Sequence, residues 1–147
     1  LHRLIRRQRQ MCIRDRGKME GMAFSAVKDQ YPAELDAFRN HPERYDARTI
    51  GGETFTEVTA RMTPAIRQIV AAHNHPTDNV LDVSHGAALN AEINALIGTP
   101  LADYRKRGGL RNTSVTVLET TDGQSFKLID WNDTSFLTAT ATPTDTI

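Results

Sequence analysis

The stretch NVLDVSHGAALNAEI, residues 79–93, decides the fold because two different periodicities meet at His85. Before the histidine, residues 80–83 form a short and largely apolar run, which predicts a strand. After it, residues 87–97 carry a helical pattern that ends at Gly98. Ligands of α/β sheets bind beyond the carboxyl ends of strands, so His85 occupies a position that favours chemistry.

The residues around His85 suit the binding of an anion. Gly86 follows directly and allows backbone to come close to a ligand, and the free N–H groups at the helix start attract negative charge. An imidazole beside them can hold a phosphoryl oxygen and stabilise charge that develops during transfer. The local pattern also fits a structural histidine with satisfied hydrogen bonds, and on its own it leaves both interpretations open.

The other segments complete an α/β pattern. Thr54 and Glu57 form a capping box for an amphipathic helix over residues 54–73, in which Pro64 predicts a kink or a new helix start capped by Thr63. Residues 17–31 predict a turn and then a short helix, and residues 32–49 predict a second short helix followed by an irregular loop. Residues 114–131 predict two strands joined at Asp122–Gly123, a dipeptide that favours a hairpin turn. The order strand, helix, strand, strand favours an α/β fold.

Length and composition indicate one globular domain of 147 residues, 39% hydrophobic and 24% charged. We expect a cytoplasmic protein without a membrane partner, since no apolar run is long enough to span a bilayer. Cys12 is the single cysteine, which excludes an internal disulfide. His73 and His75 lack further ligands at metal spacing, so we expect neither a metal site nor a cofactor.

The N-terminal segment, residues 1–16, differs in kind from the rest. It holds six arginines against one aspartate, a net charge of +5, whereas the remainder holds 12 basic and 17 acidic residues. Clustered arginines are compatible with a nucleic-acid-binding arm or with a solvated tail. We favour a third interpretation, a non-native segment, because the chain starts with Leu1 and QMCIRDR is similar to translated sequencing-adaptor DNA. Residues 17–137 then form a partial domain, and residues 138–147 a disordered tail.

Five motifs, in order and spacing, resemble those of the histidine phosphatase superfamily, also called phosphoglycerate-mutase-like. They are GKMEG at 17–21, GETFTEVTAR at 52–61, VLDVSHG at 80–86, GLRNTSV at 109–115 and WNDT at 131–134. The first is similar to the family's G-x-W-E-G with Met19 in place of tryptophan. The resemblance implies the C-terminal portion of a three-layer α/β/α fold with a mainly parallel sheet and a C-terminal β-hairpin.

The resemblance also implies phosphoryl transfer or phosphomonoester hydrolysis through a phosphohistidine. A first histidine, in an R-H-G motif, attacks phosphorus, and a second histidine, which matches His85, binds the phosphoryl group and stabilises the transition state. Among the residues themselves, Gly86 and Asn112 are candidates for contact with the phosphate, although a turn role is an alternative for Asn112. For Glu53 and Glu57, helix capping is the alternative to contact with a substrate. For the basic loop 105–111, a solvated surface is the alternative to attraction of an anionic substrate.

The sequence departs from the family pattern at one decisive point, since R-H-G occurs nowhere in the 147 residues. We therefore expect an N-terminally truncated and inactive chain whose complete protein acts on a phosphorylated small molecule. A non-catalytic phospho-ligand module and a nucleic-acid-binding module are the alternatives, and we rank both below it. The sequence leaves the substrate, the choice between mutase and phosphatase, and the oligomeric state open.

Overall fold

The computed structural model describes residues 14–73 and 75–138. The expectations for residues 1–13 and for nearly all of the 138–147 tail therefore lie outside the described residues. The elements, in chain order, are η1 (Gly17–Met19), α2 (Phe24–Gln30), α3 (Pro32–Asn40), η2 (Pro42–Arg44), η3 (Ala47–Thr49), α4 (Phe55–Ala72), α5 (Gly86–Leu96), η4 (Leu101–Asp103), β1 (Val115–Glu119) and β2 (Lys127–Asp133).

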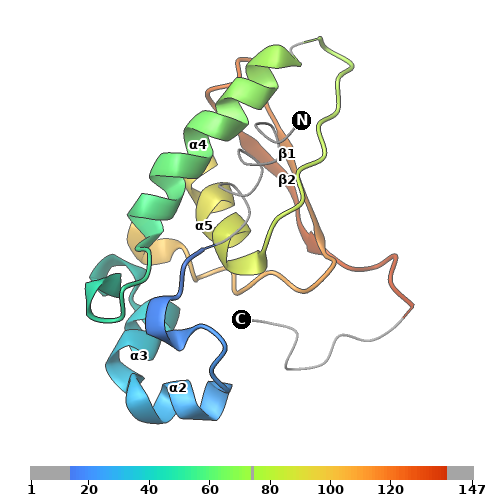
Figure 1. Cartoon of the computed structure of the whole chain (residues 1–147). Coiled ribbons are helices and arrows are strands. Elements are labelled where there is room, and N and C mark those ends of the chain that lie inside the picture. The colour runs from blue at the N-terminus through green and yellow to red at the C-terminus, as the bar shows by residue number, and fades with distance from the viewer. Residues whose placement is uncertain (1–13, 74, 139–147) are drawn as a thin grey trace, which may run out of the picture.

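The long helix α4 packs against α5, with α2 and α3 gathered at the N-terminal end of α4 (Figure 1). Its start has the predicted capping box, in which Thr54 Oγ1 accepts the Glu57 N–H and the Glu57 carboxylate accepts the Thr54 N–H. The helix continues through Pro64, so the predicted second start was wrong. The Thr63 hydroxyl does not cap a helix but donates to Glu92 on α5.

The core lies where α3, α4, α5 and the loops beside them meet. Phe55 stacks on Phe38 at a centroid distance of 5.4 Å, and Tyr45 and Tyr104 contact Phe55 edge to face. Small residues of α5, including the fully buried Ala88, allow it to lie close to this aromatic group. Burial of these rings contributes to the hydrophobic stabilisation of this part of the molecule.

The predicted hairpin is confirmed. β1 and β2 pair in antiparallel fashion, and Gly123 has the expected left-handed backbone with a φ of 67°. The Asp122 carboxylate accepts the N–H groups of Gln124 and Ser125, which fixes the turn. The turn also reaches α4, because Arg67 donates to the Gln124 carbonyl.

The predicted strand before His85 is not formed. Residues 79–84 run toward α5 without strand pairing, and Leu81 and Val83 are 86% and 73% exposed. A strand is stabilised by hydrogen bonds to a neighbouring strand. Within the described part of the chain, β1 and β2 pair with each other in the one sheet that forms. The sheet of these residues is therefore a two-stranded antiparallel ribbon.

Candidate functional site

His85 is the residue that immediately precedes α5. Its backbone is extended (φ −101°, ψ 144°), and its carbonyl accepts the N–H of Leu89 to close the first helical turn. The side chain is exposed and makes no capping hydrogen bond. Within the described residues, the imidazole is therefore available to a ligand at the N-terminal end of a helix, where N–H groups lack partners of their own.

Gly86 is held against the loop that leads to β1. A Cβ atom at this position would lie 3.4 Å from the carbonyl oxygen of Leu110, at van der Waals contact distance. Leu110 is buried, and Figure 1 shows this loop passing close to the start of α5. The contact brings two segments that are distant in sequence together beside His85.

Asn112 lies two residues beyond that contact, in a turn closed by the bond from the Ser114 N–H to the Arg111 carbonyl. Its side chain is exposed, and no hydrogen bond in the described part joins it to His85. The next residue, Thr113, has a left-handed φ of 59°, which is rare for a β-branched side chain. The Thr113 hydroxyl donates to the Asn112 carbonyl at 2.6 Å.

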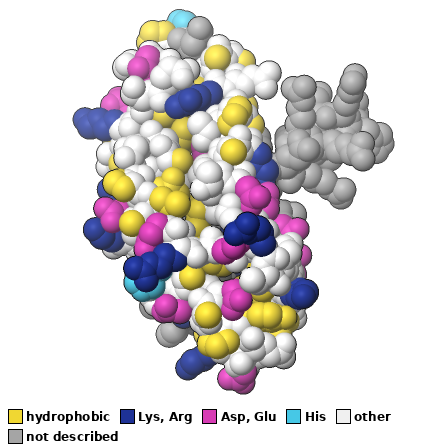
Figure 2. Space-filling view, turned by 90° about the vertical axis from the view of Figure 1, so that its left-hand side faces the viewer, with side chains coloured by type: hydrophobic (Ala, Val, Ile, Leu, Met, Phe, Trp, Pro, Cys, Tyr) yellow, Lys and Arg dark blue, Asp and Glu magenta, His cyan; other side chains and the backbone are white. Residues whose placement is uncertain are grey.

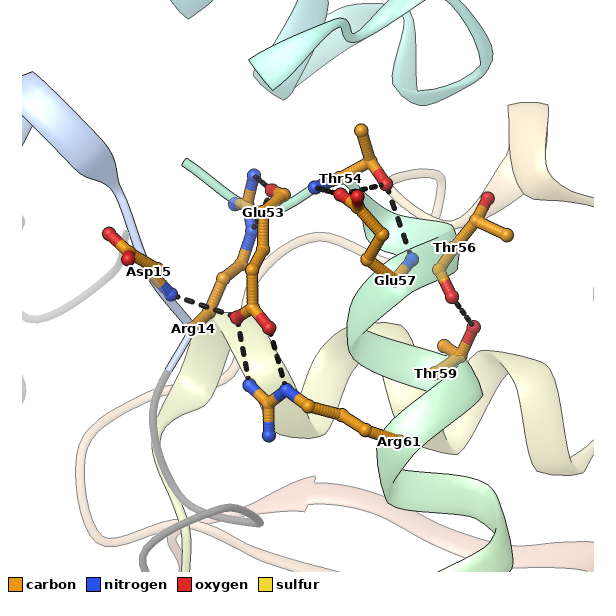
Figure 3. Close-up of polar contacts among 8 residues, drawn as sticks. All are labelled: Arg14, Asp15, Glu53, Thr54, Thr56, Glu57, Thr59 and Arg61. Carbon is orange, nitrogen blue, oxygen red and sulfur yellow. Dashed lines mark hydrogen bonds and ion pairs between the residues drawn. The ribbon is translucent and has the colours of Figure 1, made fainter. Parts of the chain in front are cut away.

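Glu53 and Glu57 have separate structural roles at the start of α4 (Figure 3). Glu57 caps the helix, as predicted, and its bonds to Thr54 lower the pKa of its carboxyl. Glu53 forms a bidentate pair with Arg61, with N–O distances of 2.7 and 2.9 Å, and accepts the Asp15 N–H. The hydrogen bonds from Arg61 lower the pKa of Glu53 despite partial burial.

Arg14 is buried beside this pair. Its guanidinium donates to the Glu53 carbonyl and lies over the rings of Phe38, Tyr45 and Phe55 at 4.3–4.8 Å. Burial lowers the pKa of the Arg14 guanidinium. Arg14, the first residue that the structure describes, thus packs on the aromatic core.

The basic loop does not present its cations to one common ligand. Arg105 lies over the Phe38 ring at 4.2 Å, and burial lowers its pKa to about 10. Lys106 pairs with Asp103 at 2.8 Å. Arg107 donates to Asn94 and Thr99, and Arg111 donates to Thr134. These contacts fasten the loop to the rest of the fold.

Two asparagines that the sequence interpretation left without a role hold the same loop. Asn90 of α5 donates to the Gly108 carbonyl at 2.9 Å, and Asn132 of β2 accepts the Arg111 N–H at 2.7 Å. Asn132 lies in the motif WNDT at residues 131–134, and this motif is the feature of the sequence that could have indicated a role for it. In the described part of the chain, no three His, Cys, Asp or Glu side chains gather as metal ligands, and no helix is long and apolar enough to cross a membrane.

The sequence profile of the histidine phosphatase superfamily (branch 1) matches residues 7–134. The chain belongs to this superfamily. The match covers the predicted domain 17–137 up to residue 134, and it begins ten residues before that domain.

Among curated members of the histidine phosphatase superfamily, a glucosyl-3-phosphoglycerate phosphatase of Mycobacterium tuberculosis (strain ATCC 25618 / H37Rv) is 33% identical over 123 residues, which cover 78% of this chain and 54% of that protein. Phosphoglycerate mutase-like protein 4 of Arabidopsis thaliana is 27% identical and is covered over 51% of its length by 84% of this chain. The chain therefore spans about half the length of these relatives.

Solved structures agree with this assignment. Bacillus stearothermophilus YhfR is similar with a TM-score of 0.73 and 29% identity, over 84% of this chain and 59% of that one. A mycobacterial glucosyl-3-phosphoglycerate phosphatase in complex with VO3 has a TM-score of 0.73 and 26% identity, over 84% of this chain and 60% of that one. The fold is thus an α/β fold of the phosphoglycerate-mutase-like type.

Proposed function

We propose that this chain carries one half of a phosphoryl-binding site, with His85 as the residue that holds the phosphoryl group. The observation that supports it is the exposed His85 side chain at the start of α5, where Gly86 packs against Leu110 and leaves no side chain between imidazole and helix terminus. An imidazole N–H and the first N–H groups of α5 would donate to phosphoryl oxygens together. Gly86 and Asn112 are the proposed neighbours of the bound phosphate.

The complete protein, on this proposal, transfers or hydrolyses the phosphoryl group of a small molecule through a phosphohistidine on a separate R-H-G segment. Phosphatases of phosphorylated small molecules among the relatives support this substrate class. The complete fold would add parallel strands beside residues 80–83, in a three-layer α/β/α arrangement. The cytoplasm, where phosphorylated metabolites are handled, is the proposed location.

The chain alone is proposed to bind phosphate without turning it over. Loss of the nucleophile removes the covalent route, and the remaining groups can stabilise an oxyanion but cannot form a phosphoenzyme. A non-catalytic phospho-ligand module is the alternative that the missing R-H-G favours. A nucleic-acid-binding role ranks lower, because the Arg14 guanidinium is buried over aromatic rings and the charges on the face in Figure 2 are of mixed sign.

The test is a titration of the chain with inorganic phosphate and with orthovanadate, monitored by calorimetry and by the backbone amide resonances at the start of α5, which the wild type and the variants share. We expect saturable binding that His85→Ala abolishes and that His75→Ala, at an exposed loop histidine, leaves unchanged. Hydrolysis of p-nitrophenyl phosphate should stay at the uncatalysed rate. A hydrolysis rate that falls on His85→Ala would overturn the proposed inactivity, and phosphate binding that is indifferent to His85 would overturn the proposed site.

Salt-sensitive binding to duplex DNA that is lost on deletion of residues 1–13, which keeps Arg14 on the aromatic core, would instead favour the nucleic-acid role. The same deletion bears on the proposal that residues 1–16 are non-native. If phosphate binding survives the deletion, residues 1–13 contribute nothing that the site requires.

A further inference from the structure

The loop between η4 and β1 is held at two points by side-chain amides. From one side, Asn90 donates to the Gly108 carbonyl at 2.9 Å, and the Asn90 side chain is fully buried on α5. From the other side, Asn132 accepts the Arg111 N–H at 2.7 Å and donates to the Gly109 carbonyl at 3.4 Å. In the loop, both asparagines bind backbone N–H or carbonyl groups, so these hydrogen bonds fix the path of the loop whatever its side chains are.

The Asn132 amide engages the peptide groups on either side of Leu110. It binds the carbonyl of the residue before Leu110 and the N–H of the residue after it. A carboxamide has one acceptor and one donor at this spacing, so it substitutes for the peptide of a neighbouring strand. Leu110 is the residue whose carbonyl lies against Gly86. Asn132 therefore determines how the loop sits on the start of α5.

A β-bulge aims Asn132 at this loop. Val117 pairs with Asp130 and Val115 with Asp133, so β2 has one more residue than β1 between these pairs. Asn132 lies in the bulge with a left-handed φ of 59°, and its N–H is taken up by the Thr116 hydroxyl at 3.0 Å. Bulges re-aim side chains next to functional sites, and asparagine adopts the left-handed conformation more readily than most residues.

We infer that Asn132 is a positioning residue for the phosphoryl site. By fixing Leu110 over Gly86, it sets the distance between the His85–Gly86 peptide and the turn that carries Asn112. The bulge in β2, opposite Thr116, orients the Asn132 side chain, and the Asn132 amide in turn binds the peptide groups on both sides of Leu110. The inference rests on the proposed phosphoryl site and adds to it a residue that touches no phosphate itself.

The variant that isolates the side chain is Asn132→Gly, because glycine keeps the left-handed backbone of the bulge and removes only the amide. We expect it to unfold cooperatively, to exchange the Arg111 amide proton at least about tenfold faster, and to bind inorganic phosphate about fivefold more weakly. These factors correspond to the loss of one to two ordinary hydrogen bonds. Asn79→Gly, at an exposed loop asparagine, is the matched control and should change neither reading.

The outcomes distinguish failure of the proposed phosphoryl site from failure of the proposed positioning role of Asn132. A wild-type chain that binds no phosphate overturns the proposed function. A wild-type chain that binds phosphate with the affinity of Asn132→Gly overturns the positioning role alone. If Asn132→Gly fails to fold, Thr116→Val is measured in its place. It removes the acceptor that holds the bulge, and it should weaken phosphate binding in the same direction, whereas unchanged affinity in a folded Thr116→Val overturns the inference.

Discussion

Thr63 and Glu92 join the two long helices directly, because the Thr63 hydroxyl of α4 donates a hydrogen bond of 2.8 Å to Oε1 of Glu92 on α5. Glu92 is fully buried, and its second carboxyl oxygen has no hydrogen-bond partner among the described residues. Burial raises the pKa of the Glu92 carboxyl to about 7, against an opposing effect of the Thr63 bond. The contact between α4 and α5 thus contains a carboxyl group whose pKa lies near neutral pH.

Stability should fall as the pH rises past the pKa of Glu92. Because the folded pKa lies above the ordinary value of 4.5, the folded state binds the extra proton, and the stabilisation is complete below about pH 4.5 and lost as the pH passes about 7. The shift corresponds to up to about 3 kcal/mol. Urea unfolding at about pH 5 and about pH 8 should show this slope in the wild type and lose it in Glu92→Gln.

The control for this experiment is Glu119→Gln, at an exposed glutamate of β1. It should leave the difference between the two pH values as in the wild type. An equal slope in Glu92→Gln and wild type would mean that another group is responsible.

Removal of the helix cap should destabilise the protein by about 1 kcal/mol. In Thr54→Ala, the Glu57 N–H loses its acceptor at the start of α4, and an N-cap hydroxyl typically contributes this amount. The measurement is the free energy of unfolding in urea. The comparison is Thr56→Ala, at an exposed threonine two residues after Thr54. It should lower the free energy of unfolding clearly less, since the Thr56 side chain takes no part in the cap.

The Glu53–Arg61 pair should contribute stability that acid removes. The pKa of Glu53 is lowered by the hydrogen bonds from Arg61, so the contribution is present above the ordinary value of 4.5 and lost as the pH falls through the folded value. Both side chains are 26% exposed, which places the pair between a surface and a buried one. Arg61→Ala should cost about 1–2 kcal/mol at neutral pH, and Arg61→Lys should restore part of it.

A double-mutant cycle of Glu53→Gln and Arg61→Ala gives the coupling of the two side chains. A coupling that does not decline in acid would contradict the assignment of the effect to this ion pair.

Self-association should depend on the outer face of β1. Val115 and Val117 are each 43% exposed and alternate along an apolar strand, which is a recognised liability for edge pairing. Sedimentation velocity at increasing concentration should reveal oligomers, and Val117→Thr, which keeps the β-branched shape, should reduce them. Thr121→Val, in the connection to β2, provides a reference for a change outside the strand.

The elements that sequence predicts best are those fixed by local chemistry. The Thr54–Glu57 cap, the helix after His85 and the Asp122–Gly123 turn depend on neighbouring residues, and each has formed. The strand at residues 80–83 failed because a strand depends on a partner that the local sequence does not contain.

The proposed site shows the same division. His85 and Gly86 are proposed from the local His–Gly–helix pattern, whereas the proposed role of Asn132 arises from a bulge in a hairpin that ends 48 residues after His85 in the sequence. At Pro64 the predicted new helix start was wrong, because α4 runs unbroken from Phe55 to Ala72 and Thr63 bonds to Glu92 of α5 instead of capping a helix.

The exposed run at residues 79–83 should make the chain cleavable at a defined place. An extended, accessible backbone fits a protease cleft, and the side chain of Leu81 is 86% exposed. A protease that prefers leucine should cut there early and separate the helical N-terminal portion from the portion that holds α5 and the hairpin. Because α4 and α5 remain packed across the cut, the two fragments should travel together until denaturant parts them.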